Sequence, residues 1–170
     1  MFRRKLHGAV GSIREIVFGL EDSLVSTLGA VTGIAAGTDS SYIVMLSGLV
    51  LIAVESVSMA AGSYLSSEAA GEAERRNEHP VRAAVVMFVS YVVGGLFPLT
   101  PYLLLPVSEA YLPSIIATIM ALFTLGVWKG KITGRSRLMS GLQMTAVSLA
   151  AAFLGYVIGR LVANFAGVSS

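Results

Sequence analysis

The sequence predicts an all-α polytopic membrane protein with five transmembrane helices, on three observations. Of its residues, 55% are hydrophobic and 13% are charged, whereas a soluble domain carries about 25% charged residues. The mean hydropathy is +0.77, and the apolar residues fall in runs of about 20, the length that spans hydrocarbon. The basic residues gather in alternate connections between these runs, which is typical of membrane proteins.

The apolar runs define one transmembrane domain over residues 1–170. The expected spans are 15–37, 42–66, 81–105, 113–128 and 138–164. We expect the second span to continue as a helix beyond the membrane. In the third, Pro98 and Pro101 each lack a backbone donor, so the helix is expected to kink or end there. No cleavage site of small residues follows the first run, so it is expected to remain a span rather than a signal peptide.

The distribution of Lys and Arg predicts the orientation of the chain. These residues lie before the first span, between the second and third, and between the fourth and fifth, with Arg160 as the exception. The positive-inside rule makes these segments cytoplasmic. The N-terminus is therefore expected in the cytoplasm and the C-terminus outside. The odd number of spans does not fit two inverted halves within one chain.

Composition and motifs exclude several classes of protein. The chain has no cysteine, which excludes disulfides, thiolate metal sites and cysteine nucleophiles. It has no nucleotide-binding glycine pattern, no HExxH and no nucleophile paired with a base. We therefore expect neither an enzyme nor a bound cofactor. Topology accounts for the basic loops, so no nucleic-acid partner is expected.

One charged residue, Glu55, stands near the middle of the second span, with Met59 one turn later on the same face. An ionisable residue inside a membrane indicates a functional site because burying it is costly. Carboxylate oxygens attract divalent cations, and a thioether adds affinity for softer ones. The pair therefore favours Fe²⁺ or Mn²⁺ over Mg²⁺ or Ca²⁺, with Glu55 as the acid that exchanges a proton for the metal.

The first span adds two adjacent acids, Glu21 and Asp22. Adjacent residues point about 100° apart on a helix, so one of them can line a site while the other pairs or meets water. Asp22 comes to the depth of Met59 if the first two helices are antiparallel. The predicted metal ligands are Asp22, Glu55 and Met59, with Glu21 as a further candidate.

Beyond the second span, Glu68 and Glu72 lie four residues apart. On a continuing helix they share a face. They either collect cations at a cytoplasmic mouth or belong to a solvated helix end, where Glu72 pairs with Arg76.

Small residues recur near four-residue spacing in the first span, which lets another helix approach closely. They are Gly19, Ser23, Ser26, Gly29, Gly33 and Gly37. This small-residue stripe packs either within the chain or against a second copy, as the seam of a homodimer.

Four segments, in order, resemble the vacuolar iron transporter family. FGLEDSLVSTLGAVTGIAAG is similar to the family's first helix and SVSMAAGSYLSSEA to its second-helix motif. HPVRAAVVMFVSYVVGGLFPLTPYLL resembles the third helix with its paired prolines, and TGRSRLMSGLQMTAVSLAAAFLGYVIGRL the fifth. The resemblance implies a homodimer with the metal path at the subunit interface, and Fe²⁺ or Mn²⁺ moved out of the cytosol against protons. Asp22 and Met59 fall on the family's transport positions.

The chain departs from the family pattern in two places. The family's second-helix glutamate lies two turns before the Met, where this chain has Leu51, and its own acid, Glu55, is one turn closer. Many members also insert a long cytoplasmic helical domain, rich in Glu and Met, between the second and third helices. Here a short polar connection takes its place, as in a short bacterial-type member of a prokaryotic plasma membrane.

The leading function is thus a proton-coupled exporter of a divalent transition metal, which is its substrate. One alternative is a transporter of the same fold for another solute, since Leu51 breaks the metal pattern. The other is a non-transporting membrane subunit whose small-residue helices serve assembly. The acids Asp22 and Glu55 separate them, because an assembly subunit has no use for buried carboxylates.

The predicted orientation can be tested with single cysteines, since the chain has none of its own. A cysteine replacing Ser170 should react with a membrane-impermeant thiol reagent added outside intact cells, whereas one replacing Asn77 should react only after the cells are opened. The reverse pattern would contradict the orientation and the direction of export.

Overall fold

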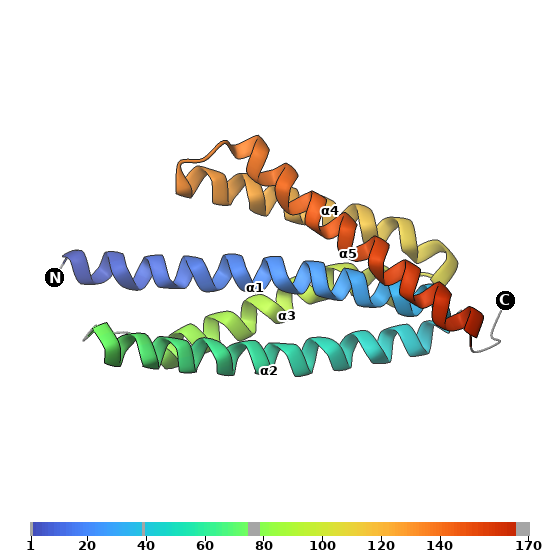
Figure 1. The fold of residues 1–170 in the computed structure, drawn as a ribbon, viewed down its shortest axis with the longest axis horizontal. Coiled ribbons are helices and arrows are strands. Elements are labelled where there is room, and N and C mark those ends of the chain that lie inside the picture. Colours follow the sequence, from blue (N-terminus) through green and yellow to red (C-terminus); the bar gives the residue numbers. More distant parts are fainter. Residues whose placement is uncertain (1, 39, 75–78, 166–170) are drawn as a thin grey trace.

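The computed structural model is a bundle of five helices (Figure 1). These are α1 (Phe2–Gly37), α2 (Ser41–Glu74), α3 (Pro80–Leu104), α4 (Val107–Thr133) and α5 (Arg137–Phe165). The structure describes residues 2–38, 40–74 and 79–165, with the backbone alone at 2–11 and 72–74. Within these residues the fold is all-α, and each helix is long and apolar enough to cross a membrane. The predicted fold class and number of spans are confirmed.

Four of the helices, α1, α2, α4 and α5, are longer than the predicted spans, because helical hydrogen bonding continues past the apolar run, whereas α3 has the length of its predicted span. The fourth shows this best: α4 covers 107–133 where 113–128 was expected. Serine hydroxyls accept from backbone N–H groups at two helix starts, Ser40 from Ile43 at 3.4 Å and Ser136 from Met139 at 3.5 Å. Gly134, at φ 69°, ends α4 in the left-handed conformation that glycine adopts without strain. As expected, α2 extends well past the second span.

The two prolines of α3 lie inside the helix, close to its end. The helix passes through Pro98 and Pro101 and stops at Leu104, and the N–H of Leu105 donates to the Pro101 carbonyl. Ser114 of α4 donates from Oγ to the Pro98 carbonyl at 2.7 Å. This bond ties the two helices together where the prolines interrupt the backbone ladder.

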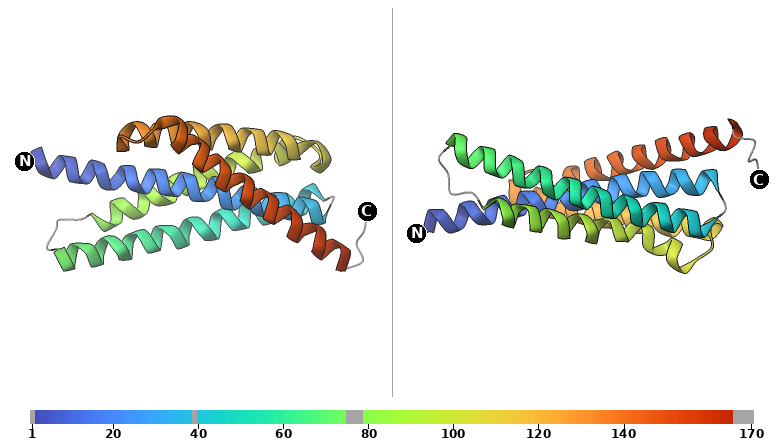
Figure 2. Two further views of the ribbon diagram at one scale, coloured as in Figure 1. Left: turned by 45° about the horizontal axis from the view of Figure 1, so that its top comes forward. Right: turned by 90° about the horizontal axis from the view of Figure 1, so that it is seen from below.

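The segments that carry most of the basic residues lie at one end of the bundle. The N-terminal end of α1, the end of α2, the start of α3 and the α4–α5 connection lie at one end of the bundle, and α5 ends at the other (Figures 1 and 2). We call the end of the bundle where α1 begins the basic end. The geometry agrees with the predicted clustering of Lys and Arg, while the side of the membrane that this end faces stays a prediction.

Helix α1 lies at the centre and packs against each of the other four helices. Its small-residue stripe is covered within the chain. Gly29, Gly33 and Gly37 lie against Ala151, Gly155 and Gly159 of α5, and Gly19 lies against Met87 and Ser90 of α3. The interpretation of this stripe as a homodimer seam is therefore wrong, because these positions are already filled by the chain's own helices.

Two apolar clusters complete the core. One joins α1, α2, α3 and α4 at the end opposite the basic end, around the fully buried Val31, Val44 and Leu99. The other joins α1, α4 and α5 through Leu24, Leu122 and Met144. Large apolar side chains cover the outer faces of the helices, which suits contact with lipid.

The glycine contact between α1 and α5 gives a stability prediction. A methyl group at Gly155 would meet the carbonyl of Gly29, so Gly155→Ala should push the two helices apart and lower stability by about 1–3 kcal/mol. Gly62 of α2 is the control, because a methyl group there meets no atom within 4 Å. Gly62→Ala should be neutral or slightly stabilising. Thermal unfolding in detergent measures both, and equal melting temperatures would contradict the close approach.

Candidate functional site

Asp22 of α1 and Glu55 of α2 approach each other inside their spans. Glu55 lies close enough to act electrostatically on the Asp22 carboxylate, as does the neighbouring Glu21. Both Asp22 and Glu55 are half-buried, and both lie within the apolar windows that could cross a membrane. Two acids from different helices therefore share one region, as the sequence suggested.

The register of α1 against α2 sets the depth of Met59. The two helices touch at two levels through pairs that fix an antiparallel alignment, Val31 with Gly48 and Glu15 with Ser63. Interpolation between these pairs sets Asp22 level with residues 56–57, between Glu55 and Met59 and within one turn of each. Met59 is half-buried. We call Asp22, Glu55 and Met59 the acid cluster.

Glu21 forms an ion pair, which is one of the two roles that the sequence left open for the adjacent acids. Its carboxylate pairs with the ammonium group of Lys129 on α4, at 3.4 Å between Oε2 and Nζ. Both side chains are partly exposed, so the pair contributes little to stability. The two adjacent acids of α1 thus point to different neighbours, because successive residues on a helix point about 100° apart. Glu21 faces α4, and Asp22 faces the region of Glu55.

Tyr91 of α3 is a neighbour of the acid cluster that sequence reasoning missed. The side chain is fully buried, and its hydroxyl forms a 2.8 Å hydrogen bond with the Ser26 hydroxyl on α1. Asp22 and Glu55 both act electrostatically on Tyr91. The sequence gives no sign that this tyrosine lies beside the acid cluster, because only the packing of α3 against α1 brings it there.

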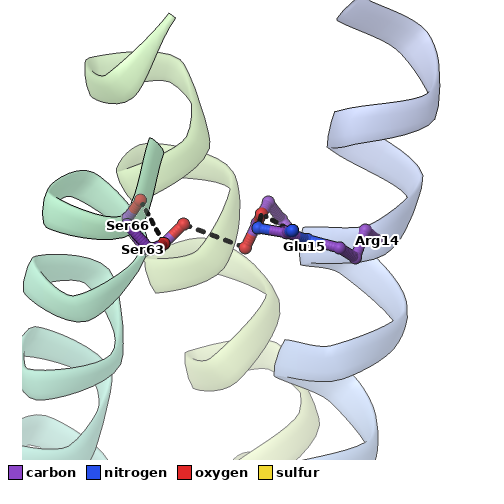
Figure 3. Close-up of polar contacts among 4 residues, drawn as sticks. All are labelled: Arg14, Glu15, Ser63 and Ser66. Atoms are coloured by element: carbon purple, nitrogen blue, oxygen red, sulfur yellow. Dashed lines mark hydrogen bonds and ion pairs between the residues drawn. The ribbon is translucent and has the colours of Figure 1, made fainter. Parts of the chain in front are cut away.

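Glu15, treated in the sequence only as the start of a span, is a second missed residue. It is 3% exposed, and its Oε2 accepts a hydrogen bond from Ser63 Oγ of α2 at 2.9 Å (Figure 3). Its Oε1 accepts from Arg14, at 2.8 Å from Nη2 and 3.2 Å from Nε. The sequence contained one sign of its position: Glu15 lies seven residues before Asp22, and therefore on the same face of the helix.

Of the acids predicted beyond the second span, Glu68 does not join the acid cluster. Glu68 is exposed and accepts a hydrogen bond from Tyr64 of its own helix at 3.3 Å. The side chain of Glu72 lies outside the described residues. Among the side chains that the structure describes, no three His, Asp or Glu groups converge tightly enough to hold a metal ion.

Comparison with known proteins agrees with this architecture. A sequence model of the VIT family matches residues 13–79 and 68–160, two segments that overlap over residues 68–79. The chain is 27% identical to a vacuolar iron transporter of Centaurea cyanus, covering 84% of this chain and 85% of the relative. It is 26% identical to vacuolar iron transporter 1 of Eucalyptus grandis, covering 88% of each.

A third relative matches this chain over most of both lengths. An uncharacterized protein of Methanocaldococcus jannaschii is 29% identical, over 91% of this chain and 92% of the relative. The alignments with the two plant transporters, over 209 and 218 residues, exceed the 170 residues of this chain, so those relatives carry residues that it lacks. Five membrane-length helices and a match that covers most of the chain lead to one conclusion: the protein belongs to the VIT family.

Proposed function

We propose that the protein is a homodimeric transporter that exports a divalent transition metal, Fe²⁺ or Mn²⁺, from the cytosol in exchange for protons. The observation that carries this proposal is the pairing of Asp22 with Glu55 inside the membrane spans. The relatives named as vacuolar iron transporters support iron as one substrate.

The acid pair accounts for exchange in physical terms. Two carboxylates that repel each other in a low-dielectric region need positive charge nearby. A divalent cation neutralises both at once, and protons neutralise them one at a time. Metal and protons therefore compete for the same carboxylates, so binding of protons from one side releases the metal. Met59, within one turn of Asp22, adds a thioether that favours softer divalent ions.

The exposure of the acid cluster supports a homodimer. Asp22, Glu55 and Met59 are only half-buried in the single chain, although they lie within membrane-spanning windows. Charged groups facing hydrocarbon are costly, and the described part of one chain lacks a complete metal site. A second copy related by a two-fold axis supplies the same three residues again and covers the first set.

Transport by site variants tests the exchange mechanism. In proteoliposomes that report metal uptake and internal pH, Asp22→Asn should abolish flux, because it keeps the shape and removes the charge. Glu55→Gln should lower flux at least tenfold and remove its dependence on the pH gradient. Met59→Leu should reduce Fe²⁺ flux more than Mn²⁺ flux, since only the softer ion gains much from sulfur.

A carboxylate away from the acid cluster is the matched control for these variants. Glu109 stands in the first turn of α4, and Glu109→Gln makes the same chemical change as Glu55→Gln. It should transport as the unmodified protein does. Full flux in both Asp22→Asn and Glu55→Gln would refute metal transport through this acid pair.

Cross-linking tests the proposed dimer. Phe18, 49% exposed and one turn before Asp22 on α1, should lie close to its counterpart across the two-fold axis. Phe18→Cys should therefore give a disulfide-linked dimer in membranes on mild oxidation. Met120→Cys, at a more exposed position on α4 (65%), is the control and should stay monomeric. Cross-linking of the control alone would place the interface on another face.

A further inference from the structure

Glu15 is a buried carboxylate to which the exchange mechanism proposed above assigns no role. Its carboxylate is almost completely buried, and the bonds shown in Figure 3 are a hydrogen bond from Ser63 and an ion pair with Arg14. The Arg14 side chain is 70% exposed, so water screens its charge and weakens the pair. Among the side chains that the structure describes, these two partners compensate the buried carboxylate poorly, because burial of charge demands full pairing.

The position of Glu15 relates it to the acid cluster. Glu15 precedes Asp22 by seven residues, two helical turns or about 10.5 Å along the same face of α1. Its partner Ser63 follows Met59 by one turn on α2. Because α1 and α2 are antiparallel, the Glu15–Ser63 bond lies on the basic-end side of the acid cluster. It joins the two helices that carry the acid cluster, between that cluster and the basic end.

We propose that Glu15 and Ser63 form a gate at the basic end of the cation path; this rests on the function proposed above. In the closed state the Ser63 hydroxyl donates to Glu15 and draws α1 and α2 together over the acid cluster. A divalent cation arriving from the basic end displaces the solvated Arg14 from Oε1 and replaces the Ser63 bond at Oε2. Glu15 then holds the cation briefly on its way to Asp22, and the gate closes behind it.

In the proposed gate, the roles of Ser63 and Glu15 can be tested separately. Ser63 closes the gate through its hydroxyl, and Glu15 provides both the acceptor and the charge. Glu15→Gln keeps an oxygen that accepts from Ser63 while it removes the charge. Ser63→Ala keeps the charge while it removes the donor. Ser66 is the matched control, because its hydroxyl donates to the Ser63 carbonyl within α2, at 3.1 Å, and does not bridge the helices.

Thiol labelling tests closure without any need for transport. Met59→Cys places a single thiol one turn beyond Ser63 in a chain that otherwise has none. A membrane-impermeant maleimide is added from the basic end in sealed vesicles, after thermal unfolding has shown that each variant folds. Adding Ser63→Ala should speed labelling about tenfold, whereas Ser66→Ala should leave it unchanged. Ser63→Thr restores a hydroxyl and should return labelling to the slow rate. Equal rates with and without the Ser63 hydroxyl would overturn the gate.

Metal flux tests the charge of Glu15. With Met59 intact, Glu15→Gln should lower metal flux at least tenfold while labelling of the corresponding Met59→Cys variant stays slow. Flux equal to that of the unmodified chain would overturn the role of Glu15 in passing the cation. If the unmodified chain itself moved no metal, the proposed function would fail, and the labelling rates would still decide whether Ser63 closes this end of the protein.

Discussion

The fold depends on how closely α1 can approach its neighbours. In a membrane, helices gain little from hydrophobic burial against each other, so close packing of small residues holds them together. Gly29 and Gly33 of α1 lie against Gly155 and Gly159 of α5. Gly19 does the same against α3. These contacts fix the rotation of α1 about its axis, and that rotation decides where its charged residues point.

The three acids of α1 meet three different environments as a result. Glu21 faces α4 and is paired with Lys129. Glu15 is buried against α2, where Ser63 donates to it. Asp22 faces another carboxylate, Glu55. The last arrangement brings carboxylates of two different helices together, and among the described residues no cation is paired with Asp22, so a mobile cation gains most here. The other two acids have partners within the chain that a cation would first have to displace.

The acid cluster and Glu15 differ in how far they are buried, and therefore in how an ion can reach them. The acid cluster is half-buried in one chain, which leaves it open to a second copy and to an ion. Glu15 is closed off by the chain's own side chains, so its access depends on separating α1 from α2 at the basic end. In the proposed gate, separating α1 from α2 opens the acid cluster to the basic end, which the proposed exchange of metal for protons requires.

The sequence by itself determined the class of the protein and singled out its candidate site residues. Five apolar runs of membrane length dictate five helices because backbone groups in lipid must bond within each segment. Asp22, Glu55 and Met59 stood out because charge in such runs is costly and because helical spacing pairs residues four apart. Helical periodicity defines faces without saying which neighbour covers each of them. Only the tertiary structure decided that the small-residue stripe meets α5, that Glu21 meets Lys129, and that Glu15 and Tyr91 are buried beside α2 and α1. These outcomes depend on the rotation and crossing of whole helices, which residues far apart in the chain set together.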